Sequence, residues 1–307
     1  MDNDIDSVEY AAVSSPQRAE ALAMLVSQEP ASERAGRVAT IAAAFRQGDN
    51  STPTLVGAKQ NEKLVGVAWG QVLPGKTALL WPPHILKGER EIIGDRLQMF
   101  LDTQLEALGI RMAQAVLPNR EHASAKRLTR VGYSHAADLL YLATQVDRVD
   151  TGTADRDIEF EPFALADRDR LAVLIEKTYI DTLDVPALDG VRDIGDVLDG
   201  YEQTGEFSPD RWFFIRNNRQ DVGCLLLSDH PSQQQWELVY MGIVPEARGH
   251  RWGLQATRFA QQRAKDAGRQ RLILAVDASN DPAVSAYTKA GFFELLRRSV
   301  LLKIFSV

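Results

Sequence analysis

Arginine and glycine gather at the start of one expected helix, in the stretch LVYMGIVPEARGHRWGLQ at 238–255. The stretch reads as a buried strand, a tight turn and a helix. A helix N-terminus leaves main-chain N–H groups unpaired and carries partial positive charge, so phosphates bind there readily. Gly249 and Gly253 have no Cβ to block close approach to the main chain, and Arg248 can add a bidentate phosphate contact. The turn therefore predicts a site for a phosphorylated ligand.

Basic residues continue beyond this turn, in a chain whose formal net charge is −7. They are Arg251, Arg258, Arg263, Lys265, Arg269 and Arg271. A local basic strip of this kind can attract a ligand with several phosphates. A solvated helix face with a glycine turn is the alternative that the turn alone leaves open. A Walker loop and a Rossmann fingerprint are both excluded, because no Gly-Lys-Ser/Thr follows the turn and no G-x-G-x-x-G is present.

The segment PEARGHRWG at 245–253 resembles the acetyl-CoA pyrophosphate loop of the GNAT N-acetyltransferases, whose pattern is Q/R-x-x-G-x-G/A. Arg248 and Gly253 fill the first and last positions, whereas Arg251 stands at the family's middle glycine. A second segment, SNDPAVSAYTKAGF at 279–292, is similar to the family pattern N-x-x-A-x-x-x-Y-x-K-x-G-F. With both motifs in order, the chain most resembles the mycothiol synthase-like tandem acetyltransferases.

The resemblance implies direct transfer of an acetyl group from acetyl-CoA to a primary amine. In the family, the strand before the loop splays from its neighbour, and its unpaired main-chain groups hold the pantetheine arm like an added strand. A main-chain N–H within 241–243 is the expected oxyanion donor. The coenzyme-binding residues predicted in this way are Met241, Ile243, Val244, Arg248, Gly249, His250, Arg251, Trp252, Gly253 and Asn280.

Glu237 and Tyr287 are the predicted catalytic residues. Glu237 lies at the start of the strand and could take a proton from the amine, directly or through water, while the resemblance gives Tyr287 the protonation of the CoA thiolate. Each has a structural alternative, a half-exposed strand residue for Glu237 and a buried tyrosine bonded to main chain for Tyr287. Asn280 could bond the pantetheine amides or cap the helix that Pro282 opens.

The elements that must position these residues occur twice, with a period of about 160 residues. KLVGVAWGQVL at 63–73 resembles QDVGCLLLSDH at 220–230. An apolar run and a helix follow in each copy, and these helices end at Gly109 and Gly268, as helix C-termini often do. Each copy reads β-α-α-β-β-β-α-β-α-β, which predicts an α/β fold in which a mixed sheet is flanked by helices.

We therefore expect two tandem GNAT-like acyl-CoA N-acyltransferase domains, a degenerate one at 1–147 and a complete one at 157–307. The polar, charged stretch VDRVDTGTADRD at 146–157 is the expected linker. The first copy shares the plan but not the chemistry, because its loop lacks the R-x-x-G-x-G pattern and Leu128 lies near the tyrosine position.

Composition limits the classes of function. The 307 residues are 45% hydrophobic and 25% charged, as is usual for a globular protein. No broad basic face is implied, so no nucleic-acid partner is expected. No apolar run is long enough to span a membrane and no secretory signal is visible. The single cysteine, Cys224, suits a reducing cytoplasm and reads as a small core residue, and no metal site is expected.

Two functions follow from these patterns. The leading hypothesis is an N-acetyltransferase with one working site, in the C-terminal domain, that uses acetyl-CoA and a small-molecule amine. The alternative is a non-catalytic CoA-binding regulator. The acidic stretch at 176–201 could receive a cationic amine, although a solvated loop is the favoured interpretation of its carboxylates.

Overall fold

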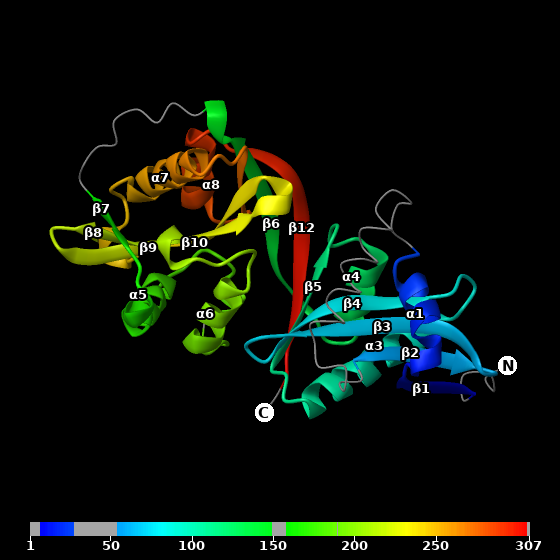
Figure 1. Ribbon diagram of the computed structural model, residues 1–307. Helices are drawn as coiled ribbons and strands as arrows, with labels where there is room; N and C mark the ends of the chain where they lie inside the picture. The colour runs from blue at the N-terminus through cyan, green and yellow to red at the C-terminus, as the bar shows by residue number, and fades with distance from the viewer. Residues whose placement is uncertain (1–6, 28–53, 149–157, 189, 306–307) are drawn as a thin grey trace. The chain divides into compact units, whose positions relative to one another are not determined.

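The chain forms two compact units (Figure 1). The computed structural model describes residues 7–27, 54–148, 158–188 and 190–305. The first unit comprises Met1–His135 together with Ser299–Val307, and the second comprises Ala136–Arg298. Because Ser299–Val307 belongs to the first unit, neither unit corresponds to a sequence repeat from end to end.

The first unit is built on a mixed sheet with the strand order β1-β2-β3-β4-β5-β12. Its strands are β1 (Val8–Ala12), β2 (Leu55–Gln60), β3 (Lys63–Leu73), β4 (Thr77–Ile85), β5 (Met112–Leu117) and the last part of β12 (Phe293–Ile304). Its helices are α1 (Arg18–Leu25), α3 (Glu91–Ala107) and α4 (Ala123–Arg130). Only the β4–β5 ladder is parallel among these described pairs.

Strand alternation gives this sheet two apolar faces, because successive side chains of a strand point to opposite sides. Val56 and Ala58 contribute to a cluster with Leu97, Leu101 and Leu105 of α3. The neighbouring positions Leu55, Val67 and Trp69 pack with Ala21 and Leu25 of α1 in a separate cluster on the other face. The two helices therefore cover opposite faces.

The second unit has the strand order β6-β11-β10-β9-β8-β7. Its strands are β6 (Ser134–Gln145), β7 (Glu159–Pro162), β8 (Trp212–Asn217), β9 (Gln220–His230), β10 (Gln235–Ile243) and β11 (Arg271–Asp277). Its helices are α5 (Arg168–Tyr179), α6 (Ile194–Glu202), α7 (Trp252–Asp266) and α8 (Asp281–Lys289). The β10–β11 ladder is parallel, and β11 pairs with β6 antiparallel.

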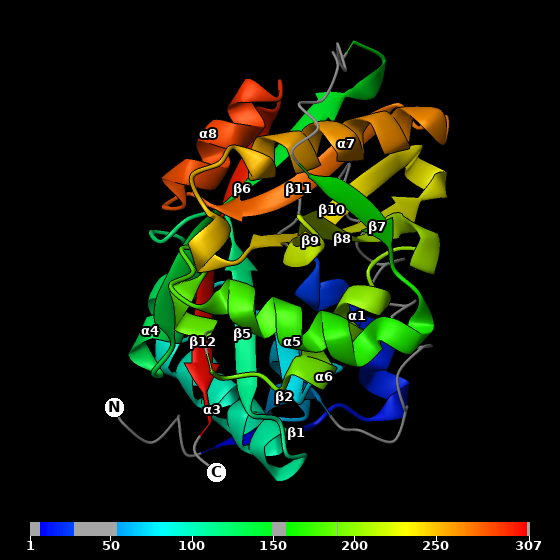
Figure 2. The same cartoon turned by 90° about the vertical axis from the view of Figure 1, so that its left-hand side faces the viewer.

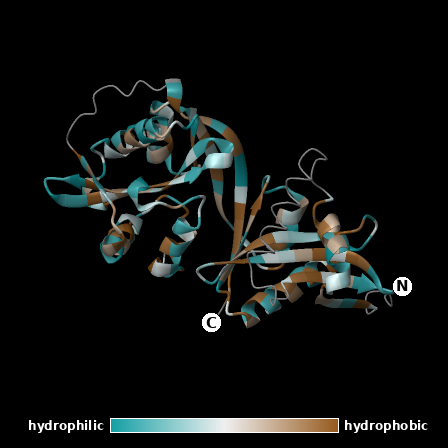
Figure 3. Cartoon of the chain, viewed as in Figure 1, coloured by the Kyte–Doolittle hydropathy of each residue, from teal (hydrophilic) through white to brown (hydrophobic). Residues whose placement is uncertain are grey.

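Helices cover both faces of this second sheet: α7 and α8 lie on one side, and α5 and α6 lie on the other (Figures 1 and 2). On α7, Ala256, Ala260 and Ala264 are fully buried at a spacing of one helical turn. Their small side chains let the helix pack closely on β10. Each helix carries both hydrophobic and hydrophilic segments, as such packing requires (Figure 3).

The predicted α/β fold, with a mixed sheet flanked by helices, is confirmed. The helices expected before Gly109 and Gly268 are α3 and α7, and both glycines have left-handed backbones, with φ of +74° and +70°. Cys224 is completely buried, as a core residue should be, and burial raises the pKa of its thiol to about 12. The second helix expected in the first copy, at 31–47, lies outside the described residues.

Terminal strands are exchanged between the two sequence repeats. Ser299–Ile304 of β12 pairs with β5 in the first unit, while Leu139–Gln145 of β6 pairs with β11 in the second. The division at 1–147 and 157–307 remains a prediction about the repeats. The expected linker lies largely outside the described residues, and its first residues form a short 3-10 turn at Val146–Arg148.

Candidate active site

The second unit contains a cavity of about 1080 Å³ where two parallel strands separate. β10 and β11 pair only from Gln235–Glu237 to Arg271–Ile273. An irregularity between Leu238 and Tyr240 follows in β10, which then continues along β9 to Ile243. β11 continues along β6 to Asp277. The splay that the family resemblance implied is therefore present, and it leaves one edge of β10 unpaired.

Main-chain groups of Met241 and Ile243 face this gap, whereas those of Val244 do not. The Val244 N–H donates to the Val222 carbonyl of β9 at 3.0 Å, and Val244 is buried. Successive N–H groups of a strand point to opposite sides, so the Ile243 and Met241 N–H groups point away from β9. The predicted contact of Val244 with the pantetheine arm stays a prediction, and its own N–H is already bonded to β9.

The turn before α7 presents free main-chain donors to the same cavity. Each N–H from Gly249 to Gly253 has no hydrogen-bond partner among the residues that the structure describes. No side chain caps the helix, whose first N–H groups and dipole point toward the turn. The cavity is lined by Gly249, Arg251, Trp252 and Gly253. This is the electrostatic arrangement that binds phosphate at a helix N-terminus.

Two residues of the turn have left-handed backbones, and one of them, Arg251, stands at the middle glycine of the family pattern. Gly249 has a φ of +86° and Arg251 a φ of +59°. A Cβ on Gly249 would meet nothing within 4 Å, so its backbone conformation, rather than crowding, favours glycine there. At Arg251 an arginine adopts the conformation that the family gives to glycine. Its side chain is exposed and the cavity still reaches the turn.

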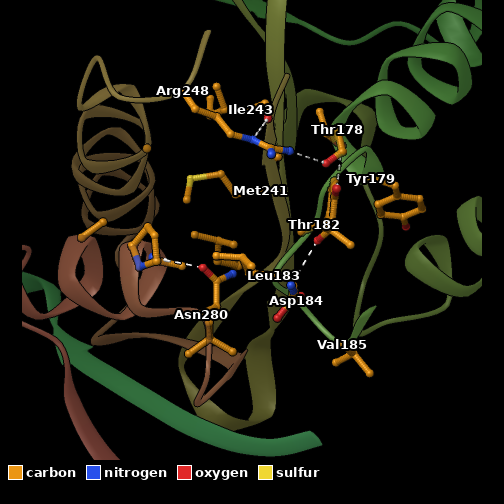
Figure 4. Close-up of a pocket in the computed structure, with 18 of the residues that line it drawn as sticks. Thr178, Tyr179, Thr182, Leu183, Asp184, Val185, Met241, Ile243, Arg248 and Asn280 are labelled. Atoms are coloured by element: carbon orange, nitrogen blue, oxygen red, sulfur yellow. Dashed lines mark hydrogen bonds between the residues drawn. The ribbon is translucent and has the colours of Figure 1, made fainter. Parts of the chain in front are cut away.

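Arg248 has a different role from the one its motif position suggested. Its Nε donates to the Ile243 carbonyl at 3.1 Å, and its Nη atoms donate to the carbonyls of Thr178, Ile180 and Asp181 at 3.1, 2.8 and 3.1 Å (Figure 4). The guanidinium thus ties the end of β10 to the end of α5. In this structure the main-chain N–H groups, and not the Arg248 side chain, are the donors available to a phosphate.

Tyr287 and Asn280 of α8 also line the cavity. The Tyr287 hydroxyl has no hydrogen-bond partner among the described residues, although the residue is 5% exposed. Burial raises its pKa, and the Asp184 charge adds to the effect, so the phenol keeps its proton at neutral pH. Asn280 Oδ1 accepts the Ala283 N–H at 3.3 Å and caps α8, which leaves its amide nitrogen for a ligand.

Glu237 lies outside the set of residues that line the cavity. It occupies the paired part of β10, before the irregularity, opposite Ser228 of β9. Its Oε2 is 2.8 Å from Nε2 of His230. The structure thus brings the predicted Tyr287, Asn280 and turn residues together around one cavity, and it places Glu237 beyond its edge. His250 stacks on Trp252, with ring centroids 4.7 Å apart.

Sequence reasoning did not single out either of the two carboxylates that line the cavity, Asp181 and Asp184. Asp184 lines it, and Asp184 Oδ1 accepts the Asp277 N–H at 3.0 Å. Asp277 Oδ2 in turn accepts the Val185 N–H at 3.2 Å, which fixes the segment after α5 against the end of β11. Burial raises the pKa of Asp184. The residue belongs to the acidic stretch interpreted as solvated, and no motif marks it among its neighbours.

The corresponding place in the first unit is filled by the protein itself. The repeat aligns Gly94 of α3 with Gly253, and a Cβ on Gly94 would lie 2.6 Å from Nε of Arg127. The buried Arg127 guanidinium donates to the Pro83 carbonyl at 2.7 Å and to Glu91 Oε2 at 2.6 Å. An internal cation therefore occupies the first turn of α3, where the second unit presents free donors.

The fold is also present in solved structures of low sequence identity. The chain shares its fold with a GCN5-related N-acetyltransferase from Sphaerobacter thermophilus, with a TM-score of 0.65, 14% identity and coverage of 97% of this chain and 96% of that one. A tandem GNAT protein from the clavulanic acid biosynthesis pathway gives a TM-score of 0.54 at 12% identity, over 97% and 98% of the two chains.

Residues 181–292 match the acetyltransferase (GNAT) family, so this part of the chain is similar to the GNAT acetyltransferases. A mycothiol acetyltransferase from Streptomyces bingchenggensis is 30% identical over 86 residues. That match spans 28% of this chain and 28% of the relative. The predicted resemblance to the GNAT acetyltransferases is confirmed over these residues. Among the described residues, no helix has the length and hydropathy to cross a membrane, and no cluster of His, Cys, Asp or Glu is arranged to hold a metal.

Proposed function

We propose that the protein is an acetyl-CoA-dependent N-acetyltransferase that acetylates a primary amine of a small acceptor by direct transfer. One observation carries the proposal: the unpaired edge of β10 and the free N–H groups from Gly249 to Gly253 open on the same cavity. The cavity volume of about 1080 Å³ suits a coenzyme arm together with a small acceptor.

Main-chain donors, a carboxylate and Tyr287 have separate roles in the proposed transfer. Acetyl-CoA supplies an activated acyl group, whose diphosphate fits the N–H groups at the α7 N-terminus. Main-chain groups of Met241 and Ile243 hold the arm and supply the oxyanion donor. The amine nitrogen bonds to the acyl carbon while the carbon–sulfur bond breaks. A proton leaves the amine for a carboxylate, and the Tyr287 hydroxyl gives one to the sulfur.

Asp184 is the carboxylate that we propose as the base. It lines the cavity, whereas Glu237 is outside the lining and bonded to His230. Burial raises the pKa of Asp184, which brings its basicity closer to that needed near neutral pH. Asp184→Asn is expected to lower kcat/KM for the amine by about a hundredfold, a typical loss for a general base. A large loss in Glu237→Gln with little change in Asp184→Asn would return the role to Glu237.

Binding of the coenzyme is tested by thermal shift. Acetyl-CoA should raise the melting temperature of the full chain, and Gly253→Glu should abolish the rise, because its carboxylate would lie at the phosphate donors. Arg219→Glu is the control for added negative charge, since Arg219 is exposed in the turn between β8 and β9 and does not line the cavity. The absence of a shift with the unaltered chain at millimolar acetyl-CoA would contradict the proposal.

A CoA-binding regulator that performs no transfer is the second candidate. Arg251 in the family's glycine position favours it, because a left-handed arginine is an uncommon choice for a coenzyme loop. Release of free thiol from acetyl-CoA with a panel of amines decides between the two. Binding without thiol release from any amine would favour the regulator.

We also propose that the chain has one working site. The Arg127 guanidinium occupies the first-unit position that would have to be open for a diphosphate. Isothermal titration should therefore give one acetyl-CoA per chain. Two equivalent sites would contradict this assignment, as would a single site that survives Gly253→Glu.

A further inference from the structure

The cavity contains a cation that the coenzyme assignment does not use. Arg192 lies just before α6 and lines the cavity. Its Nε is buried and has no hydrogen-bond partner, and within the described part of the chain no carboxylate pairs with its guanidinium. A buried guanidinium donor is costly to leave unpaired. A ligand anion would satisfy it, and a carboxylate matches its planar fork.

The surroundings of Arg192 are aromatic. The Tyr179 and Tyr201 hydroxyls are 3.0 Å apart, and the Tyr240 hydroxyl is 2.6 Å from Thr178 Oγ1. The Tyr201 and Tyr240 rings stack with centroids 5.4 Å apart, and Tyr179 meets Tyr240 edge-on at 5.7 Å. These contacts hold the rings in one wall of the cavity. Such a wall suits the carbon skeleton of a small molecule.

The Asp184 carboxylate, opposite in charge to Arg192, also acts electrostatically on Tyr179 of this wall. The pKa of Tyr179 is raised mainly by burial, the Arg192 charge lowers it, and the Asp184 charge raises it. Arg192 and Asp184 thus both act on one phenol, yet they form no ion pair with each other. A cation and a carboxylate that share a cavity without pairing can bind the two charged ends of one ligand.

We infer that the acceptor is a small amino acid-like molecule, whose carboxylate binds Arg192 and whose amine lies toward Asp184. This inference rests on the proposed acetyl transfer and narrows its substrate class. The tyrosine wall contacts the skeleton between the two charged groups. A single unpaired guanidinium favours a monovalent carboxylate over a phosphate, because the Arg248 guanidinium in the same cavity is already bonded to main-chain carbonyls.

The test compares amino acids with their decarboxylated analogues as acceptors for the full chain. Suitable pairs are leucine and isoamylamine, phenylalanine and phenethylamine, and lysine and cadaverine. The unaltered protein should prefer the carboxylated member of an accepted pair by at least about tenfold in kcat/KM. Arg192→Met should lower this preference by about tenfold or more, chiefly through KM. Arg192→Lys should retain part of it, and Arg219→Met, in the exposed turn between β8 and β9, should leave it unchanged.

Several results would overturn the inference. These are an equal preference within every pair, an equal loss for both members in Arg192→Met, or stronger acceptance of an aminoalkylphosphonate. Loss of the acetyl-CoA thermal shift in Arg192→Met would assign the arginine to the coenzyme instead. Melting of each variant without ligand identifies one that fails to fold, in which case Arg192→Lys and Arg192→Gln decide by the same ratio.

A separate binding experiment distinguishes this inference from the proposed function. Amino acids are added to the chain with free CoA, and the melting temperature is measured with and without Arg192→Met. If no amine releases thiol, the proposed transfer fails. The carboxylate subsite then stands only if amino acids still shift the melting temperature and Arg192→Met removes that shift, and it falls if they do not.

Discussion

The Lys303 ammonium lies 2.9 Å from Oδ2 of Asp102, although the two residues are 201 positions apart in the chain. Asp102 is 4% exposed, and its other oxygen accepts bonds from Tyr133 and Gln98 at 2.6 and 2.7 Å. Lys303 also donates to the Val131 carbonyl. Through β12, the end of the chain therefore supplies the cation for a carboxylate buried in the first unit.

Lys303→Met should destabilise the first unit strongly. The substitution leaves the Asp102 charge buried without its cation, and breaking a buried pair from one side costs about 3–5 kcal/mol. Burial and the Asp102 charge raise the pKa of Tyr133, so the phenol stays neutral and offers Asp102 only a hydrogen bond. Urea unfolding followed by near-ultraviolet circular dichroism measures the loss. Lys265→Met, on the exposed end of α7, is the control and should change little.

Arg248→Met separates a structural role from a phosphate contact. Because the guanidinium bonds to the carbonyls of Thr178, Ile180, Asp181 and Ile243, its removal should lower the melting temperature without any ligand. Charge-assisted hydrogen bonds contribute about 1.5–3 kcal/mol each, partly offset here by exposure. Arg248→Lys should recover little, because an ammonium cannot reach the same carbonyls together.

One combination of results would contradict the structural role of Arg248. A normal melting temperature without ligand, together with a large loss of acetyl-CoA affinity, would mean that Arg248 binds the diphosphate and leaves its carbonyl partners when the coenzyme enters. Gly253→Glu supplies the comparison, because it should affect binding and not the fold without ligand.

Arg251→Gly should stabilise the chain by about 1 kcal/mol. A non-glycine residue in the left-handed region costs about 1–2 kcal/mol, which glycine avoids, although its greater freedom in the unfolded chain offsets part of the gain. The measurement is the free energy of unfolding from denaturant titration. Arg251→Ala is the control for charge, since alanine keeps the conformational cost. An equal gain in both variants would attribute the effect to charge.

The sequence predicted the scaffold of the site better than its chemistry. Strand and helix periodicity, together with Gly109 and Gly268, located α3 and α7, because these signals are local. The turn before α7 was predicted for the same reason. The hydrogen bonds of the Arg248 side chain were not predicted, since its partners Thr178 and Ile180 are distant in sequence. Asp184 was missed because its place in the cavity wall and its bond from the Asp277 N–H depend on how the segment after α5 folds over the cavity.

The exchange of β12 also escaped sequence reasoning. Both repeats end in an apolar strand of the same pattern, LLYLATQ in one and SVLLKIF in the other. Hydrophobic alternation states which face of a strand is buried, and it does not state which sheet the strand joins. Lys303 favours the pairing of β12 in the first unit, because its ammonium donates to Asp102 there.

Asp184 should make both stability and activity depend on pH. Its pKa in the folded chain is raised above the ordinary 3.8, chiefly by burial. Between 3.8 and that raised value the folded state therefore binds more protons than the unfolded state, so stability falls as pH rises through this window. The same ionisation supplies the base, so kcat/KM should rise with pH over the window while the melting temperature falls. Asp184→Asn should flatten the fall in melting temperature and remove this limb of the activity profile. If the melting temperature of Asp184→Asn keeps the full dependence of the unaltered chain, another carboxylate carries it, and the case for Asp184 as base is lost.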